Sequence, residues 1–499
     1  YWIVVDSTTM VPVAGGSGWP EQTYGPPGAV VDAAFTINPV AGPLFGGMQA
    51  TVSDDFNPTG LTAAEHFARR SFAAGQIVED IDFGFSFNVV TNLEGGDATS
   101  PQGSLRQFIT NANAGTGPNT MRFVPTVATN ATDGTNNWWS LNVTTSLPAI
   151  VTASTTLDGT AFDAADGIGL LDPNGAGPDL ELNGSGAGGN GLEITGDGTV
   201  VRDLVVNRFA SGIAVLAGDG SLIAGNYLGP DATGLVGEVG NTNEGVLVFG
   251  ATNTVIGGTA ASDRNVISGN RLRGIAIDDW SDGAGVISDG TQIIGNYIGT
   301  NATGTAALRY NGGATPAYQQ IGVYLLDSPD GVIGTAATGN LMSGNEWYAI
   351  YIWGPNATNN KIQGNTMGLD AVGSSPVPNG YESITRAAIH LSNAPGNLIG
   401  GTGAEGNVIV SNSSRGVVIN GSSAIDNAVI GNSIYGNGDI GIDLELDGVT
   451  LNDVGDVDTG AGNDLLNFPV ITSAVETAGT IAIDFDLDVP AGNYRIEFF

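Results

Sequence analysis

A phrase of about a dozen residues recurs in this chain at nearly constant spacing. Residues 223–234 read IAGNYLGPDATG, residues 293–304 read IIGNYIGTNATG, and residues 362–373 read IQGNTMGLDAVG. The Gly-Asn pairs that begin at residues 225, 295, 364 and 431 follow one another at spacings of 70, 69 and 67 residues. Such repetition indicates a solenoid, because each unit has an apolar face that only a neighbouring unit can cover.

Short apolar strands, most of them led by glycine, lie between these pairs. Each has three to five residues rich in Val, Ile or Leu, which is typical of buried strands and too short for helices. Most recur every 21 to 33 residues, with occasional insertions. We therefore predict an all-β fold, a right-handed parallel β-helix with three strands per coil. The nine strands are GLEI at 191, GIAV at 212, GVLV at 245, GIAI at 274, GVYL at 322, AIYI at 349, AIHL at 388, GVVI at 416 and GIDL at 441.

Asparagine closes many of the repeated units. The segments NVISGN (265–270), NLMSGN (340–345) and NVIVSN (407–412) end or begin with it, as do the Gly-Asn pairs. Asparagine tolerates left-handed turn geometry, and stacked asparagines can hydrogen-bond to one another along a column. We interpret the repeated asparagines as structural.

The two ends of the solenoid have different sequence patterns. Ser104 can cap a helix over residues 103–114, in which Leu105, Phe108 and Ile109 share one face. We predict that this amphipathic helix covers the first end of a solenoid spanning residues 89–467. Residues 1–88 are expected to form a separate β domain, with residues 61–75 as a candidate helix. Residues 468–499 are expected to start a β-sandwich-like domain of three strands, which is too few to close it.

Composition excludes several classes of partner and chemistry. The formal net charge of −36 repels phosphate backbones and anionic membranes, so we expect no nucleic-acid partner. The chain has no cysteine, which excludes disulfides, zinc–thiolate sites and thiol catalysis. No run approaches the roughly 18 apolar residues needed for a transmembrane helix, so we expect no membrane insertion.

Several segments in a fixed order give the chain a family likeness. They are DIDFGFSFNVV, GSLRQFITNANAGTGPNTMRFVP, LPAIVTASTTLDGTA, NVISGN, GNYIGT and NDVGDVDTGAGNDLLNFPVI. With them the chain resembles large secreted bacterial surface proteins with right-handed parallel β-helix repeats. The resemblance implies an extracellular or cell-surface location within a long precursor. We expect an extracellular structural or adhesive protein, with a carbohydrate-active β-helix enzyme (a polysaccharide lyase or hydrolase) as the alternative.

The enzyme alternative depends on clustered carboxylates on adjacent coils. The best candidates are Asp278, Asp279 and Asp282, followed one coil later by Asp327 and Asp330. Arg271 and Arg273 precede the first group. No characteristic His or Lys companion accompanies them, so the sequence favours a protein that is not an enzyme. His390 is interpreted as a strand side chain.

A second acidic segment has the pattern of a calcium loop. Residues 451–468 place carboxylate and amide oxygens around three glycines, with no cation nearby. Hard oxygen ligands of this kind suit Ca²⁺, although the spacing is not that of an EF-hand. The alternative is a solvated acidic turn. The candidate ligands are Asp453, Asp456, Asp458, Asn463 and Asp464.

Two further surfaces are expected to contact partners. The insertions at 229–244, 299–320 and 368–387 occur once in every two coils, so they should leave one corner at intervals of about 10 Å and contact surface glycans or neighbouring subunits. The alternative is that they are tolerated surface loops without a partner. Tyr310, Tyr318 and Tyr381 lie in them. The apolar strand of residues 1–10 has no evident partner, so it is expected to complete the 468–499 domain of a neighbouring copy in a head-to-tail fibre. The alternative is that the chain is a piece of a long monomer.

Overall fold

The structure is a computed structural model of the 499-residue chain. The structure describes residues 102–497 except 166, 279–287, 311–316 and 382–385, and before them residues 2–5, 7, 10, 19–24, 28–31, 37–40, 45, 67–69, 74–75 and 83–95. Two of the candidate catalytic residues, Asp279 and Asp282, therefore lie outside the described residues.

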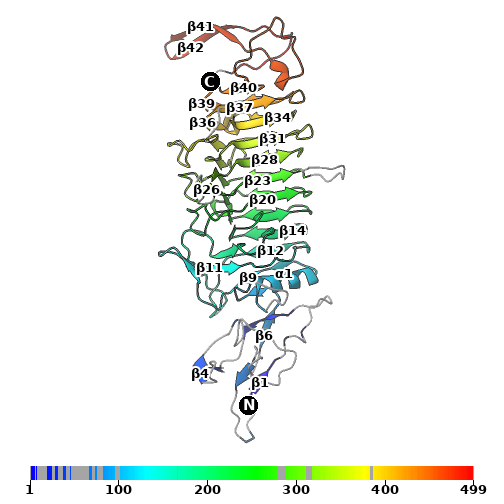
Figure 1. The fold of residues 1–499 in the computed structure, drawn as a ribbon, viewed down its shortest axis with the longest axis vertical. Helices are drawn as coiled ribbons and strands as arrows, with labels where there is room; N and C mark the ends of the chain where they lie inside the picture. The colour runs from blue at the N-terminus through cyan, green and yellow to red at the C-terminus, as the bar shows by residue number, and fades with distance from the viewer. Residues whose placement is uncertain are drawn as a thin grey trace.

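Most of the described chain winds into a stack of coils (Figure 1). Each regular coil gives one strand to each of three sheets in turn, and every neighbouring pair in these sheets is parallel except β10–β11. The predicted parallel β-helix is therefore confirmed. One sheet contains all nine of the predicted apolar strands. Its members are β14 (Leu192–Ile194), β17 (Ile213–Val215), β20 (Glu244–Phe249), β23 (Arg273–Asp278), β28 (Ile321–Leu326), β31 (Tyr348–Trp353), β34 (Ala387–Ser392), β37 (Arg415–Asn420) and β40 (Ile442–Leu444).

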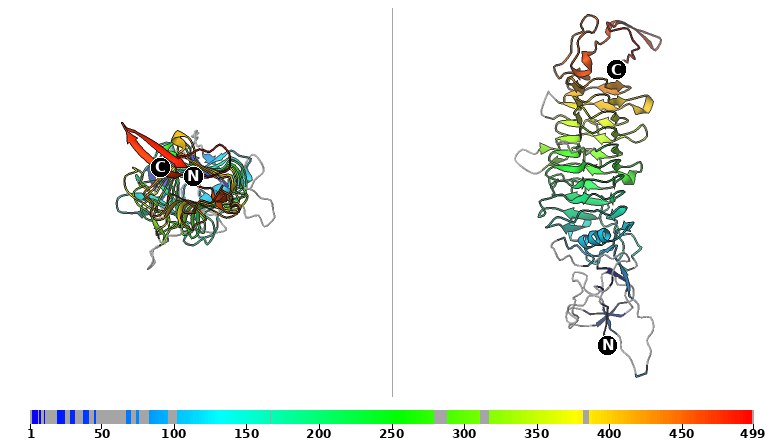
Figure 2. Two further views of the ribbon diagram at one scale, coloured as in Figure 1. Left: turned by 90° about the horizontal axis from the view of Figure 1, so that it is seen from above. Right: turned by 90° about the vertical axis from the view of Figure 1, so that its right-hand side faces the viewer.

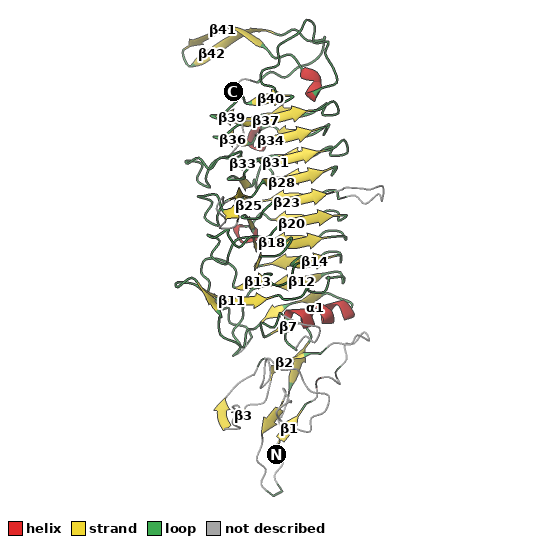
Figure 3. Ribbon diagram, viewed as in Figure 1, coloured by secondary structure: helices red, strands yellow, loops and turns green. Residues whose placement is uncertain are grey.

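The other two sheets have ten and eleven strands (Figures 2 and 3). The ten-stranded sheet contains β8 (Asn119–Thr120), β12 (Thr155–Asp158), β15 (Val200–Arg202), β18 (Leu222–Ala224), β21 (Val255–Gly257), β24 (Gln292–Ile294), β29 (Val332–Ile333), β32 (Lys361–Ile362), β35 (Leu398–Gly400) and β38 (Ala428–Ile430). The eleven-stranded sheet contains β10 (Ala131–Thr132), β11 (Asn137–Asn142), β13 (Leu180–Asn183), β16 (Leu204–Asn207), β19 (Tyr227–Leu228), β22 (Val266–Ile267), β25 (Tyr297–Ile298), β30 (Leu341–Met342), β33 (Thr366–Met367), β36 (Val408–Val410) and β39 (Ser433–Tyr435). Short 3₁₀ turns are η2 (Ala261–Asp263), η3 (Gly403–Glu405) and η4 (Gly462–Leu465).

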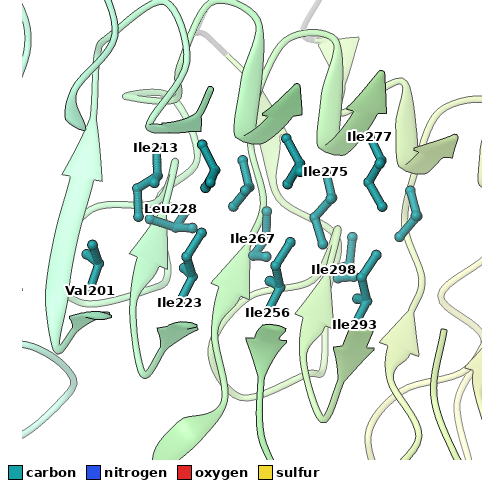
Figure 4. Close-up of a cluster of buried hydrophobic side chains, with 14 of the residues drawn as sticks. Val201, Ile213, Ile223, Leu228, Ile256, Ile267, Ile275, Ile277, Ile293 and Ile298 are labelled. Atoms are coloured by element: carbon teal, nitrogen blue, oxygen red, sulfur yellow. The ribbon is translucent and has the colours of Figure 1, made fainter. Parts of the chain in front are cut away.

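The core is a continuous column of aliphatic side chains inside the coils. Figure 4 shows residues from all three sheets pointing toward one another, among them Ile223, Ile267 and Ile275. All three are fully buried. Since successive strand residues point to opposite faces, one to three inward side chains per strand suffice to fill the interior. This explains why the strands are so short.

Three columns of asparagine, with one glutamine in the second, fix the corners between the sheets. At the first corner each side-chain oxygen accepts from both the backbone N–H and the side-chain amide of the preceding asparagine, as Asn340 does from Asn296 at 3.0 and 3.1 Å. The predicted side-chain ladder is therefore confirmed. The first column is Asn226, Asn265, Asn296, Asn340, Asn365, Asn407 and Asn432; the second is Asn241, Asn270, Gln319, Asn345, Asn379, Asn412 and Asn437; the third is Asn360, Asn397, Asn427 and Asn463.

A helix covers the first end of the stack, as predicted. Helix α1 (Leu105–Ala114) begins after Ser104, whose hydroxyl accepts from the backbone N–H of Gln107 at 3.1 Å. Leu105, Phe108 and Ile109 are buried in the main apolar core. Next to α1, strand β7 (Val89–Val90) pairs in parallel with β9 (Arg122–Phe123). No helix in the described part of the chain has the length and apolar character to cross a membrane.

Apart from β7, the described strands before the helix form short antiparallel pairs, which correct two expectations. Strand β1 (Trp2–Val4) pairs with β5 (Phe67–Arg69), so the first strand has a partner within its own chain. Residues 67–69 are a strand rather than part of a helix, because they pair with β1 in a distant part of the sequence. The other pairs are β2 (Glu21–Tyr24) with β6 (Gly84–Ser86) and β3 (Gly28–Val31) with β4 (Ile37–Val40).

The last described segment is a single hairpin rather than three strands. Strand β41 (Val470–Thr477) pairs with β42 (Thr480–Asp486), and both carry exposed apolar side chains such as Ile481. The expectation of a third strand is wrong for residues 493–497, which do not form a strand. These residues turn back to the stack, where the Glu497 carboxylate accepts from the backbone N–H of Gly431 at 2.6 Å.

Candidate functional site

The three insertions leave the same corner of the β-helix, as predicted. They follow β19, β25 and β33 of the eleven-stranded sheet and lead into β20, β28 and β34 of the nine-stranded sheet. The loops also contact one another directly: the backbone N–H of Ala302 donates to Gly234 O, and that of Ala371 donates to Gly304 O, both at 2.9 Å. The predicted interval of about 10 Å between loops does not by itself imply direct contact. Through these hydrogen bonds the three loops form one continuous column.

Each loop opens with a turn held by an Asn or Asp side chain near its start. The side-chain oxygen of Asn301 accepts from Thr305 N–H at 2.9 Å, and Asp370 accepts from Ser374 N–H at 2.8 Å. Asp231 does the same with Val236 N–H at 3.1 Å. The backbone bonds of Asp370, chiefly that from Ser374, lower the pKa of its carboxyl. The acidic side chains in the repeated phrase are therefore turn residues.

Aromatic rings from two loops meet beside this column. The rings of Tyr318 and Tyr381 are stacked, with centroids 4.6 Å apart and planes 11° apart. The guanidinium of Arg309 lies 5.2 Å from the Tyr318 ring centroid, and its Nε donates to the Tyr318 hydroxyl at 3.2 Å. Tyr310 lies in β26 (Arg309–Tyr310), which pairs with β27 (Ala317–Tyr318). The structure therefore brings two of the three predicted tyrosines together.

A second group of rings lies on the outward face of the nine-stranded sheet. Register places Tyr324, Tyr351 and His390 at equivalent positions on β28, β31 and β34. Tyr351 lies 5.6 Å from Tyr324 and 4.9 Å from His390, measured between ring centroids. Tyr348 packs against Tyr351 and His390 at 5.1 and 5.3 Å. Burial, partly opposed by Arg273, raises the pKa of Tyr324 to about 12.

Arg386 packs against Trp347 and Tyr348, beside the loop that carries Tyr381. Its guanidinium lies 4.6 Å from the Trp347 ring centroid, and its Nη1 donates to the Tyr348 hydroxyl at 3.0 Å. Gly380 lies against it, since a Cβ there would be 3.5 Å from the Arg386 Cβ, and Tyr381 follows Gly380 directly. We define the arginine–aromatic face as Arg309, Tyr318, Trp347, Tyr348, Tyr381 and Arg386. Sequence reasoning missed four of these, Arg309, Trp347, Tyr348 and Arg386; the signal for the two aromatic residues was the run EWYAIYIW at 346–353.

His390 is a buried strand side chain, as interpreted from the sequence. Its Nε2 lies 2.7 Å from Asn420 Oδ1, and Nδ1 is shielded from solvent without a hydrogen-bond partner among the described residues. Burial is the main cause that lowers the pKa of its imidazole to about 4, and Arg386 adds to it. The neutral ring therefore serves packing at neutral pH.

The carboxylates of the enzyme alternative are only partly assembled. Asp278 pairs in register with Leu326, which places it one coil from Asp327. Asp327 is a turn residue with φ of 51°, and its Oδ1 accepts from Asn356 N–H at 3.0 Å. A hollow of about 350 Å³ beside it is also lined by Trp353 and holds no second carboxylate among the described residues. Asp330 has φ of 57° and likewise occupies a turn.

The candidate calcium loop brings together three of its five predicted ligands. Carboxylate oxygens of Asp453, Asp456 and Asp458 all lie within 4.8 Å of one another. One oxygen each of Asp453 and Asp458 is shielded from solvent without a hydrogen-bond partner among the described residues. Unpaired, shielded oxygens are costly unless a cation satisfies them. This donor set fits Ca²⁺.

The other two predicted ligands lie elsewhere. The Asn463 oxygen accepts from Asn427 N–H at 3.0 Å and so extends the third asparagine column. Asp464 Oδ1 accepts from Gly460 N–H at 2.9 Å. Both side chains therefore accept hydrogen bonds from backbone N–H groups and stabilise the turn that covers the last coil.

Comparisons with known proteins give few matches. No family model and no curated protein matches the chain. Among solved structures, it is similar to the crystal structure of bacteriophage CBA120 tailspike protein 3, with 12% sequence identity and a TM-score of 0.27. The match covers 74% of this chain and 56% of the tailspike, so the chain spans about half the length of that protein. The assignment of a parallel β-helix rests on the strand pairing described above.

Proposed function

We propose that this protein is an extracellular structural and adhesive protein of a cell surface. In this proposal the β-helix is a stiff rod that presents the column of loops and the arginine–aromatic face to surface glycans. The observation that carries it is the direct stacking of three loops at one corner of a core fixed by asparagine columns. Aromatic side chains with polar tips suit sugar binding, since sugars offer both apolar faces and hydroxyl groups.

Binding to isolated cell-surface polysaccharide tests the adhesive role. Replacing both Tyr318 and Tyr381 with alanine removes the stacked pair, and we expect binding to fall at least tenfold. Val372→Ala is the matched control, because Val372 lies in the third loop at 80% exposure and outside the aromatic pair. Unchanged binding of the double tyrosine variant would refute the role of this surface.

The alternative function is a carbohydrate-active enzyme. The neighbouring positions of Asp278 and Asp327 favour it, whereas the turn role of Asp327 does not. Incubation with neutral and acidic polysaccharides, followed by measurement of new reducing ends and unsaturated products, decides between the two. We expect no product. Product that disappears in Asp327→Asn would establish the enzyme.

Association between copies is a further proposal for the same rod. The exposed apolar residues Ile471, Val475 and Ile481 of the β41–β42 hairpin favour it, since an unfinished sheet can accept a strand. The pairing of β1 with β5 means that residues 1–10 would first have to leave their own chain. Sedimentation of the protein with and without residues 1–10 tests this: equal filament formation by both would refute a donor role for that strand.

A further inference from the structure

The arginine–aromatic face contains two arginines in a strongly acidic protein, together with one adjacent carboxylate, Glu346, which accepts from Trp347 Nε1 at 3.2 Å. The chain carries 50 acidic and 14 basic residues. Ion pairs form at Arg202, Arg208, Arg273, Arg415 and Arg495, whereas Arg264 lies over the ring of Tyr297 as Arg309 lies over that of Tyr318. Among the described residues, Arg309 and Arg386 have no carboxylate partner. Two unpaired guanidinium groups therefore stand beside the same pair of loops.

Arg386 has unused hydrogen-bonding capacity. Its single hydrogen bond with the described residues runs from Nη1 to the Tyr348 hydroxyl. Nε is shielded from solvent and has no partner there. A guanidinium offers five N–H donors in a planar fork that matches a carboxylate or sulfate. Leaving such a group half-buried without an anion is unfavourable, because its desolvation is not compensated.

The aromatic residues around the two arginines suit a saccharide rather than a small inorganic anion. Tyr318, Tyr381 and Trp347 are each half-buried, so part of every ring is accessible from the surface. The rings hold the arginines in place through the contacts at 5.2 and 4.6 Å. Tyr318 and Tyr381 come from two successive loops of the column, so the face continues from one loop to the next.

From this arrangement we propose that the arginine–aromatic face binds an acidic polysaccharide. Arg309 and Arg386 would take carboxylate or sulfate groups, and the aromatic residues would contact the sugar rings between them. The rest of the protein, with its net charge of −36, repels such a polymer, so binding is confined to this face. This inference rests on the proposed adhesive function and names its ligand class.

Polygalacturonate and its fully methyl-esterified form test the charge requirement, because they share a sugar and differ in charge. We expect the whole protein to bind polygalacturonate at least tenfold more tightly than the ester at low ionic strength. Arg386→Gln and Arg309→Gln should each weaken polygalacturonate binding at least fivefold. Lys361→Gln removes the same charge from exposed Lys361 on β32, in a different sheet, and should leave binding unchanged.

The outcomes separate this inference from the adhesive function. Equal binding of acid and ester would overturn the acidic class and leave adhesion to glycans standing, whereas no binding to either polymer or to isolated surface polysaccharide would overturn both. Equal loss in Lys361→Gln would show general attraction of anions and overturn the site. Polyglutamate bound as tightly as polygalacturonate would identify an acidic protein as the ligand and also overturn it. Since Arg309 is exposed, its variant should fold normally even if Arg386→Gln does not.

Discussion

The side-chain oxygen of Asn296 accepts two hydrogen bonds from Asn265, one from its backbone N–H at 3.3 Å and one from its side-chain amide at 2.9 Å. The Asn296 amide in turn donates to Ile256 O at 2.8 Å and to Asn340 at 3.1 Å. Each asparagine between the two ends of the column is thus both acceptor and donor for its neighbours. No other side chain of this size can fill both roles in a fully buried corner.

Replacing Asn296 with alanine should therefore destabilise the fold by about 2–4 kcal/mol, because several buried partners lose their hydrogen bonds at once. Chemical denaturation measures this loss. Asn356→Ala is the control, since Asn356 is exposed, and it should change stability by less than about 0.5 kcal/mol. Similar losses in both variants would contradict the role of the column.

Phe108→Ala tests the cap at the first end of the stack. Phe108 is 1% exposed, and removing its ring should cost about 3–5 kcal/mol and leave the end of the core uncovered. We expect a lower melting temperature and, from the uncovered strands, a rise in aggregation measured by light scattering. Thr110→Ala on the exposed side of the helix should show neither effect.

His390 should make stability dependent on pH. Its pKa is about 4 in the folded protein and about 6.5 when unfolded, so the unfolded chain takes up the proton first. The neutral His390 ring contributes about 3 kcal/mol to the free energy of unfolding. This contribution is complete above pH 6.5 and is lost as the pH falls toward 4. Unfolding free energies measured across this range should fall less steeply in His390→Phe than in the original protein.

Asp179 changes stability with pH in the opposite direction to His390, so the two effects must be measured in separate variants. Burial raises the pKa of its carboxyl to about 6, so its contribution to stability increases as the pH falls below 6. Asp179→Asn should therefore steepen the loss of stability toward low pH. Parallel curves for the original protein and His390→Phe would contradict the assignment to His390.

Calcium should raise the melting temperature through the loop of Asp453, Asp456 and Asp458. Binding to the folded state alone stabilises it in proportion to the logarithm of the free ion concentration. Asp456→Asn should abolish the response in a melting scan with calcium against EDTA. Asp464→Asn should keep it, since Asp464 lies outside the group of three carboxylates. A melting temperature insensitive to calcium in the original protein would remove this site.

Much of the fold could be predicted because the β-helix is built from local repeats. The nine apolar strands, the asparagine columns and the capping helix each follow from residues close together in sequence. The pairing of β1 with β5 could not be predicted, since it joins residues 2–4 to residues 67–69 across an irregular segment. The last strand failed for a related reason: its alternating pattern suits a sheet, but Glu497 instead hydrogen-bonds to Gly431 in the last coil.

The candidate site was predicted in outline and missed in detail. Repeat spacing placed the three loops at one corner, and Tyr318 and Tyr381 were named from them. Arg386 and Trp347 escaped notice because their meeting depends on the register between a loop and a strand of the preceding coil. Asn463 was predicted to bind calcium because an amide oxygen suits both a metal site and an asparagine column. Only its hydrogen bond with Asn427 distinguishes the two roles.

The direction of the hydrogen bonds has a mechanical consequence. In every coil the strands run across the stack, so the bonds between coils point along its length. A force applied at the two ends loads one coil boundary at a time, and the coils should peel away in succession. Each coil of about 30 residues would release roughly 100 Å of chain. Under tension such a rod would lengthen in steps and dissipate energy as each coil unfolds.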